Sequence, residues 1–592
     1  MCGIVGFISA NGNKAAPIVL SALRKLEYRG YDSAGMATIV NGRLHIAKGV
    51  GQLGKVENKY RISELPGNIG IGHVRWATHG EVTVKNAHPH FDCHRQIAIV
   101  HNGIINNYQE LRTSLGSRHK FTSDTDSEVV VHLIEEFMEA GIPLESAVFE
   151  VAKKISGSYA LLVMSAREPQ KIVAARKDSP LVIGVGKEGN FIASDTLPFL
   201  EDTRRVIFVE DGETVVLTGS NANIVNSDGR KVKREPQEVD WKWDAASKQG
   251  CDFFMLKEIL EQPEAMRRAL LQDTKTVMDM AMDILRAKQV VLTACGTSRY
   301  AALIGRYAFS SLAGKLSEVI MASELEYFSD SIDKNTLIIA VSQSGETADV
   351  IQGVKKAKEN GATIFSLVNV VGSTLARMSD RVIYLNCGPE IGVAATKSFM
   401  NQLTVFYILA FAMVNRLDEG IKKLEAVSNL IVENMRCNGT EIPRITNMVC
   451  KRKDFYYIAR GISFAMAGEG ALKLKEIAYV HAEGMPSGEL KHGTLALIEK
   501  NTPVLAICPC DHTFSDSIVN TAETKARKAF VIGVSDKEDK VFDEWVKIPS
   551  VEELFYPLVM VVPLQLFAYH SAIARGLDPD KPRNLAKSVT VK

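Results

Sequence analysis

The sequence predicts a multidomain α/β protein in which a mixed first domain is followed by two similar parallel-sheet domains. With 592 residues, the chain is longer than a single hydrophobic core usually organises. β-type and helix-compatible segments alternate through its second half, as they do in βαβ units. The order of these segments also repeats, which indicates a duplicated domain.

The composition is that of a globular protein, with 46% hydrophobic and 23% charged residues. Lys plus Arg (70) and Asp plus Glu (69) leave a net charge of +1, so nothing in the overall charge points to nucleic acid or to a membrane surface. The nine scattered cysteines favour a cytoplasmic protein with reduced thiols. No signal peptide is expected, and the apolar stretches Phe406–Val414 and Phe555–Tyr569 are expected to be buried helices rather than membrane spans.

The first domain is assigned to residues 1–238. It alternates two or three helical stretches with short β-type runs, namely Ile4–Ile8, Gln96–Val100, Tyr159–Met164, Phe191–Ala193, Val206–Val209 and Thr214–Leu217. A polar segment with two tryptophans then breaks the pattern, and residues 239–250 are interpreted as a linker.

The repeat defines two further domains, residues 251–425 and 426–592. β-rich runs begin near Gln289, Asn335, Thr363 and Arg381, and again near Phe455, Pro503, Ala529 and Glu544. Each set closes with a long apolar helix, Thr396–Arg416 in the first and Val551–Arg575 in the second. This alternation favours two parallel-sheet domains over one large irregular domain.

A candidate phosphate site follows the second predicted strand of the first repeat. The run Thr336–Val341 leads directly into Ser342-Gln-Ser-Gly-Glu-Thr347 and then into helical sequence, and the preceding strand ends in Cys295-Gly-Thr-Ser298. Hydroxyls and free backbone N–H groups at a helix start suit an anion, although similar turns also cap many helices. Two such turns in neighbouring βα units make phosphate binding the favoured interpretation. The loop is not a Walker A motif, so nucleotide hydrolysis is not indicated.

One face of the first helix in the second repeat carries Glu469, Lys473 and Glu476. At 100° per residue these positions lie at about 0°, 40° and −20° around the axis. They form either a salt-bridge ladder or part of a catalytic site. His481, Glu483, Glu489 and His492 follow in what is predicted to be a Gly/Pro-containing loop, which favours a site. Lys587, in the tail, is either an imine-forming lysine or a solvated one.

A histidine- and cysteine-rich patch in the first domain is weak evidence for a metal site. His88, His90, Cys93 and His94 lie close together in the sequence, but no second ligand cluster follows at a standard spacing. Neither a metal nor a cofactor is therefore predicted.

Long motifs in both halves resemble those of the glutamine–fructose-6-phosphate aminotransferase (glucosamine-6-phosphate synthase) family. In the first part they are Cys2-Gly-Ile-Val-Gly6, Leu26–Gly35, His73–Gly80 and His101–Ile104. In the second part they are Cys295–Ser298, Ser342–Thr347, Glu469–Glu476, Gly488–Gly493 and Arg583–Val591. The resemblance covers nearly the whole chain.

For the first domain, the resemblance implies an N-terminal-nucleophile hydrolase with a four-layer αββα fold. Cys2 would be the nucleophile of a glutaminase once Met1 is removed, and an α-amine titrating near ~7.7–8.0 can relay the thiol proton. Trp76 resembles a tryptophan that gates an internal ammonia channel, although a lone aromatic can also be a core residue. The resemblance further assigns the oxyanion-hole residues Asn102 and Gly103 and the glutamine-binding residues Arg75, Thr78, His79 and Asp126.

For the second part, the resemblance implies two sugar isomerase (SIS) domains that bind fructose 6-phosphate. Glu476 would move a proton between C1 and C2 with help from Lys473, and Lys587 would form an imine with C2. His492, from a neighbouring subunit, would open the sugar ring. The sugar-phosphate site would comprise Thr297, Ser298, Ser342, Gln343, Ser344, Thr347, Val393 and Ala586. Ala395 departs from the family, in which serine is common at this place.

The implied activity is hydrolysis of glutamine and transfer of its ammonia through an internal channel to fructose 6-phosphate, giving glucosamine 6-phosphate. A homodimer without a nucleic-acid or membrane partner is expected. A glutamine phosphoribosyltransferase is an alternative, but it would need an Asp-rich pyrophosphate-sugar loop after a strand. A non-catalytic sugar-phosphate-binding regulator is another, but it has no need of Cys2, Glu476 and Lys587.

Overall fold

The computed structural model describes residues 2–239, 248 and 250–590, which fall into two compact units. One contains residues 2–239 together with 588–590, and the other contains 248 and 250–587. Most of the predicted linker, residues 240–247 and 249, lies outside the described residues.

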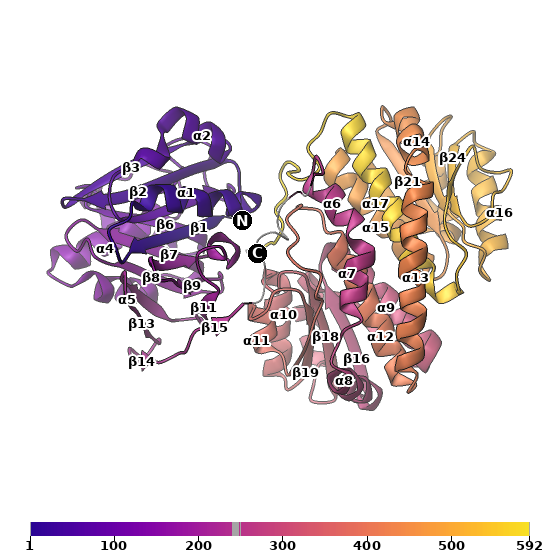
Figure 1. Cartoon of the computed structure of the whole chain (residues 1–592), viewed down its shortest axis with the longest axis horizontal. Helices are drawn as coiled ribbons and strands as arrows, with labels where there is room; N and C mark the ends of the chain where they lie inside the picture. Colours follow the sequence, from indigo (N-terminus) through magenta and orange to yellow (C-terminus); the bar gives the residue numbers. More distant parts are fainter. Residues whose placement is uncertain (1, 240–247, 249, 591–592) are drawn as a thin grey trace. The chain divides into compact units, whose positions relative to one another are not determined.

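The first unit contains two antiparallel sheets (Figure 1). The first has the strand order β15-β11-β9-β10-β1-β4-β2-β3, and the second has the order β14-β13-β12-β8-β7-β6-β5. The strands of the first sheet are β1 (Gly3–Ser9), β2 (Ser33–Val40), β3 (Arg43–Val50), β4 (Ile69–Arg75), β9 (Val182–Val185), β10 (Gly189–Ala193), β11 (Arg205–Phe208) and β15 (Gln237–Glu238). Those of the second are β5 (His90–Phe91), β6 (Ile97–Ile105), β7 (Gly157–Ser165), β8 (Ile172–Lys177), β12 (Thr214–Leu217), β13 (Ala222–Val225) and β14 (Lys231–Val232).

Helices cover the outer face of each sheet, which confirms the four-layer αββα arrangement. A buried core that includes Ile4, Ile71 and Leu162 fills the space between the sheets. Helix α1 (Ala15–Leu26) packs on the first sheet, while α4 (Glu128–Glu139) and α5 (Leu144–Lys154) pack on the second. Because α2 (Leu53–Tyr60) and α3 (Tyr108–Leu115) are also present, the expectation of two or three helical stretches was too low.

The second unit contains two parallel sheets with the same topology, which confirms the predicted duplication. The first has the order β17-β16-β18-β19-β20, and the second has the order β22-β21-β23-β24-β25. The first sheet comprises β16 (Gln289–Ala294), β17 (Glu318–Met321), β18 (Thr336–Ser342), β19 (Thr363–Val368) and β20 (Arg381–Tyr384). The second comprises β21 (Asp454–Ala459), β22 (His481–Pro486), β23 (Pro503–Ile507), β24 (Phe530–Ser535) and β25 (Glu544–Lys547).

The predicted β-rich runs correspond to all of these strands except β17 and β22. Both missed strands lie at the edge of their sheet. The prediction that His481 and Glu483 lie in a loop was therefore wrong, because residues 481–486 pair in parallel with β21. Backbone pairing with a neighbouring strand outweighs the loop-like Gly484 and Pro486.

Helices between the two parallel sheets join them through one hydrophobic core (Figure 1). Those that contribute to it include α9 (Gly296–Ala313), α12 (Lys397–Met413), α15 (Ser463–Ala478) and α17 (Tyr556–Ala574). The remaining helices of this unit are α6 (Phe254–Leu260), α7 (Gln262–Ala269), α8 (Thr274–Arg286), α10 (Ala348–Glu359), α11 (Thr374–Met378), α13 (Leu417–Cys437), α14 (Glu441–Val449) and α16 (Phe514–Lys525).

The two longest apolar stretches are core helices, as expected. Helix α12 is buried along its whole length. The segment Glu553–Ala574 is long and apolar enough to cross a membrane by composition, but 83% of its most apolar window is buried inside the protein. This burial is typical of the central helix of a globular core.

Candidate active sites

Cys2 lies directly before β1, the strand that pairs with β4 and β10 inside the first sheet. Its sulfur is 3.4 Å from the backbone nitrogen of Trp76 and 3.4 Å from the carbonyl oxygen of the same residue. Burial raises the pKa of the thiol, and the positive charge of Arg75 acts against that shift. The thiol therefore needs a base to become a nucleophile.

Asn102 and Gly103 approach Cys2 from β6 of the second sheet. The Asn102 side-chain amide donates a hydrogen bond of 3.0 Å to the Cys2 carbonyl. Its oxygen, Oδ1, is buried and has no hydrogen-bond partner among the described residues. Gly103 has a φ of 124°, and a Cβ atom at this position would lie 1.9 Å from the Ser158 carbonyl oxygen. Only glycine fits here, because both the backbone conformation and the space exclude a side chain.

Two charged groups predicted to hold glutamine lie close to this cysteine. Arg75 ends β4, and its guanidinium donates to the carbonyls of His79 (2.5 Å) and Gly80 (3.1 Å), which fixes the following loop. Asp126 accepts a hydrogen bond of 2.7 Å from the backbone of Ile105. Both charges act electrostatically on the Cys2 thiol. The structure thus brings a cation and an anion to the same nucleophile.

The other predicted residues of this site occupy the loop after β4. Trp76 and His79 are half-buried, whereas Thr78 is exposed. The His79 ring meets Tyr108 edge-on at 5.8 Å between ring centroids. Gly30 approaches the same backbone closely, because a Cβ there would lie 2.5 Å from the Arg75 carbonyl carbon. Gly30 was not among the predicted site residues, although the motif Leu26–Gly35 contains it.

The predicted phosphate loop lies at the carboxyl end of β18, and the Cys295–Ser298 turn lies at the end of neighbouring β16. In a sheet of this order, the connections from these two strands leave toward opposite sides, which opens a crevice for ligands. Ser342 Oγ accepts a hydrogen bond from the Gly345 nitrogen at 3.0 Å and lies 3.0 Å from Thr347 Oγ1. The structure therefore confirms that both hydroxyl-rich turns meet at one edge of the sheet.

Side chains around the loop connect it to neighbouring helices. The Gln402 side chain of α12 donates to Ser298 Oγ at 2.9 Å. The hydroxyl of Thr297 donates to Glu469 Oε1 at 3.2 Å and so links the loop to α15. Gln343 and Ser344 are half-buried within the loop itself.

Helix α15 carries the predicted row of charges on one face. Lys473 Nζ lies 2.5 Å from Glu476 and 3.6 Å from Glu469. Burial raises the pKa of Glu469 to about 8, and the charge of Glu476 adds to this shift. Burial alone would lower the pKa of Lys473, but the two carboxylates outweigh it and raise that pKa. Glu476 is the more solvent-accessible carboxylate, with 22% of its side chain exposed.

Lys587 forms a buried ion pair with Glu390, a residue that was not among the predicted site residues. The distance between Nζ and Oε2 is 2.5 Å, and the two side chains are 4% and 0% exposed. Backbone nitrogens of Thr396 and Ser398 also donate to Glu390. Burial acts to raise the pKa of Glu390, but Lys587 and these donors outweigh it and hold that pKa at about 2. Lys587 is thus not a solvated tail lysine.

The ion pair lies beside the α15 cluster, since the charge of Glu390 also raises the pKa of Lys473. A second buried carboxylate, Glu258, accepts from the Ile391 nitrogen at 2.5 Å, and burial raises its pKa to about 8. Glu390 comes just before the stretch 392–397, which contains Val393 and Ala395, and Glu258 accepts from the backbone nitrogen of Gly392 at 3.3 Å. Nothing in the local sequence singled out either glutamate as a site residue.

Two further predicted positions take part less directly. The Val393 nitrogen donates to the Asp580 carbonyl at 3.2 Å, so its N–H is already engaged. Ala586 is half-buried next to Lys587. His492 ends the short 3-10 helix Ser487–His492 and is exposed. The described residues of one chain give it no hydrogen bond or ion pair.

Comparison with known proteins matches both halves of the chain. Residues 73–201 match the glutamine amidotransferase domain family, and residues 283–412 and 448–575 each match the SIS domain family. The chain is 46% identical to a glutamine–fructose-6-phosphate aminotransferase (isomerizing) of Thermococcus kodakarensis and 45% identical to one of Methanothermobacter thermautotrophicus, and each alignment covers 100% of both chains. The C-terminal domain of glucosamine–fructose-6-phosphate aminotransferase from Francisella tularensis resembles it with a TM-score of 0.52 and 34% identity, over 56% of this chain and 99% of that one.

Fold and site together define an amidotransferase built from a glutaminase-type domain and a pair of SIS domains. The full-length identity is more specific. The chain belongs to the glutamine–fructose-6-phosphate aminotransferase (isomerizing) family, which confirms the resemblance drawn from its motifs.

Proposed function

We propose that this protein hydrolyses glutamine and uses the ammonia to convert fructose 6-phosphate into glucosamine 6-phosphate. The observation that carries the proposal is the presence of two separate groups of reactive side chains in one chain. Cys2 contacts Trp76 and Asn102 in the first unit, and Lys587 is paired with Glu390 beside Lys473 in the second. Family membership over the full chain supports both halves of this activity.

In the glutaminase half, Cys2 attacks the side-chain amide carbon of glutamine after Met1 has been removed. Burial raises the pKa of the Cys2 thiol, so the nucleophile needs a base to take its proton. The α-amine of the same residue is that base. The side-chain amide of Asn102, which donates to the Cys2 carbonyl in this structure, and the backbone N–H of Gly103 are the donors that would stabilise the oxyanion. Each such donor is typically worth ~3 kcal/mol. Arg75 binds the α-carboxylate and Asp126 the α-ammonium of glutamine, while Thr78 and His79 line the pocket.

In the synthase half, the hydroxyls and N–H groups of Ser342–Thr347 hold the sugar phosphate together with Thr297 and Ser298. Lys587 forms an imine with C2 of the open-chain sugar, and ammonia then displaces the lysine. Glu476 moves the proton between C1 and C2. Lys473 forms an ion pair with this carboxylate, and Glu390 holds Lys587 in place until substrate arrives. Val393 and Ala586 complete the sugar site.

The assembled enzyme is proposed to be a cytoplasmic homodimer with glutamine and fructose 6-phosphate as its substrates. The exposed position of His492 supports this assembly. An acid–base group that opens the sugar ring must contact the sugar, and in a homodimer His492 of one subunit supplies that contact in the sugar site of the other. Trp76, whose own backbone contacts the Cys2 sulfur, is proposed to gate the ammonia route. No membrane or nucleic-acid partner is proposed. Domain boundaries are proposed at 238, 250 and 425.

The direct test is to incubate the purified protein with glutamine and fructose 6-phosphate and to measure glutamate and glucosamine 6-phosphate. Both products are expected in equal amounts. Folded protein that releases glutamate from glutamine but forms no amino sugar would contradict the synthase half. Formation of a phosphoribosylamine from a pyrophosphate sugar instead would favour the phosphoribosyltransferase alternative.

Glu476→Gln is expected to slow sugar conversion by roughly 10²–10⁴-fold, because the amide cannot carry the proton between C1 and C2. The substitution keeps the shape of the side chain and leaves Lys473 paired with Glu469. The measurement is the rate of amino-sugar formation from ammonia and fructose 6-phosphate, with glutamine hydrolysis measured in parallel and expected to persist. Glu483→Gln, on the neighbouring strand β22, is the matched control. A near-wild-type rate for Glu476→Gln would exclude Glu476 as the proton carrier.

A further inference from the structure

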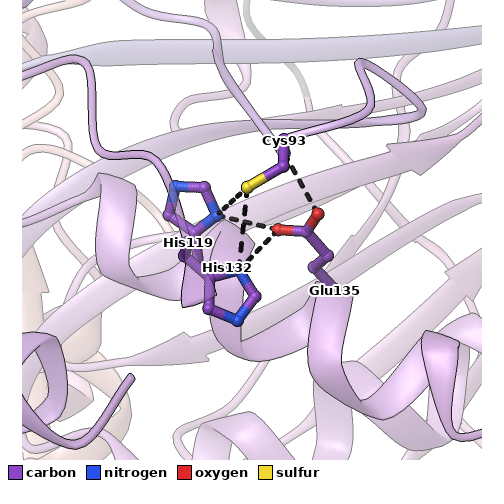
Figure 2. Close-up of side chains that lie close together, drawn as sticks. All are labelled: Cys93, His119, His132 and Glu135. Carbon is purple, nitrogen blue, oxygen red and sulfur yellow. Dashed lines mark hydrogen bonds and ion pairs between the residues drawn. The ribbon is translucent and has the colours of Figure 1, made fainter. Parts of the chain in front are cut away.

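Four potential metal ligands meet in the first unit, at a place separate from Cys2. Cys93 comes from the turn between β5 and β6, His119 follows the 3-10 helix Gly116–Arg118, and His132 and Glu135 lie on α4. Figure 2 shows the four side chains pointing toward a common centre. Their nearest ligand atoms all lie within 4.8 Å of one another.

The separations between these atoms approach those of a tetrahedral zinc site. Cys93 Sγ is 3.8 Å from His119 Nδ1 and 3.8 Å from His132 Nδ1. Glu135 Oε2 is 2.9 Å from the first of these nitrogens and 2.8 Å from the second. Zinc bonds of ~2.0–2.3 Å arranged tetrahedrally place neighbouring ligand atoms about 3.3 to 3.6 Å apart. The contacts of Glu135 are therefore shorter, and those of Cys93 slightly longer, than the separations in a tetrahedral zinc site.

The surroundings of both histidines favour a cation at the centre. His132 Nε2 lies 3.9 Å from Glu128 Oε1, and His119 Nε2 lies 3.5 Å from Glu136 Oε1. A carboxylate on the far side of an imidazole favours the tautomer with its proton on Nε2, which leaves the Nδ1 lone pair free for a metal. If both neutral rings instead carried their proton on Nδ1 and donated to Glu135, each Nε2 lone pair would face a carboxylate. That carboxylate is Glu128 for His132 and Glu136 for His119.

The other two ligands are also prepared for coordination. The backbone nitrogen of Lys120 donates to Cys93 Sγ at 3.3 Å, a contact that fixes the position of the sulfur. Glu135 Oε1 accepts from the Cys93 nitrogen at 3.1 Å, so Oε2 alone is directed at the centre. A thiolate, a carboxylate and two neutral imidazoles balance the charge of one divalent ion. His119, His132 and Glu135 are buried, while Cys93 is exposed and provides an entry path.

We propose that Cys93, His119, His132 and Glu135 bind one structural zinc ion. Four protein ligands leave no open position for a reacting water, so the ion is structural rather than catalytic. It joins the turn at Cys93 to both ends of the segment 119–132, which contains Asp126. The ion therefore stabilises the part of the domain that supports the Asp126 turn.

The test is elemental analysis of the full-length protein, equilibrated with zinc and then freed of excess metal. About one zinc ion per chain is expected. Cys93→Ser and His132→Ala are each expected to weaken zinc binding by more than about a hundredfold, since even outer-shell partners contribute about 10–100-fold. Two variants serve as matched controls and are expected to keep the ion: His94→Ala, which removes the histidine next to Cys93, and Cys510→Ser, which removes an exposed cysteine from the second unit.

A second measurement keeps the proposal testable if His132→Ala folds poorly. Replacing zinc by cobalt should give a near-ultraviolet thiolate-to-cobalt absorption in the wild-type protein and in His94→Ala, and none in Cys93→Ser. Wild-type protein that retains no zinc would overturn the proposal. So would undiminished zinc binding by Cys93→Ser together with His132→Ala, or a cobalt spectrum that lacks the thiolate band.

Discussion

Replacing Cys2 by alanine is expected to abolish glutamine hydrolysis, with a loss of roughly 10⁴-fold or more, while chemistry on the sugar with free ammonia survives. Removing a covalent nucleophile has effects of this size in other hydrolases. The sulfur is small and its backbone neighbours are fixed by the pairing of β1 with β4, so alanine fits without rearrangement. The two activities separate because the sugar-phosphate groups belong to the second unit.

Glutamate release reports the first activity, and amino-sugar formation from an ammonium salt reports the second. Cys510→Ala, which removes an exposed thiol of the second unit, is the control and should retain both activities. Loss of both activities in a folded Cys2→Ala protein would show that the division between the two sites is wrong. Retained glutamine hydrolysis would exclude Cys2 as the nucleophile.

Lys587→Arg is expected to remove amino-sugar formation by roughly 10³-fold or more, because a guanidinium cannot form an imine at C2. Glutamine hydrolysis should continue, and its ammonia should appear free in solution. Arginine is chosen because it preserves the charge that Glu390 needs. Removing that charge would leave a buried carboxylate unpaired, at a cost of about 3–5 kcal/mol.

Two measurements distinguish loss of chemistry from loss of structure in this variant. Borohydride reduction in the presence of fructose 6-phosphate should attach the sugar to the wild-type protein and not to Lys587→Arg. The thermal unfolding midpoint should stay close to that of the wild type. Lys475→Arg, an exposed lysine on α15, is the control. Sugar attachment to Lys587→Arg at the wild-type level would assign the imine to a different lysine.

Strong local patterns made most of the second unit predictable. The β-rich runs were continuous and apolar, as expected of strands covered on both faces, and each is a strand of a parallel sheet. The edge strands β17 and β22 were missed because their exposed positions interrupt the apolar pattern. In the first unit the predicted runs correspond to β1, β6, β7, β10, β11 and β12, and the other strands were missed. One of the missed strands, β4, contains two glycines. A Cβ on Gly72 would lie 2.8 Å from Val19 of α1, so packing of the helix requires glycine in this strand.

Within the candidate sites, the predicted residues were those that lie in continuous motifs. Glu390 was not predicted because a glutamate in a loop has no distinctive sequence pattern until Lys587, 197 residues later, lies beside it. The proposed zinc site was not predicted for the same reason. The His/Cys patch pointed to Cys93, but the other three ligands come from the segment 119–135, and neither His88 nor His90 belongs to the group.

The sequence by itself determined the family, the αββα and paired SIS architecture, and the motifs around Cys2, Ser342–Thr347 and Glu469–Glu476. The family and the αββα fold followed from the resemblance of long motifs. The paired parallel-sheet domains, the phosphate loop and the charged helix face followed from short-range patterns: alternation of apolar residues, helical spacing, and turns at strand ends. Only the tertiary structure decided that Lys587 is a buried partner of Glu390 and that four dispersed side chains converge at Cys93. The physical reason is that ion pairs and metal sites require contact in space, which the packing of distant segments creates and which local sequence does not encode.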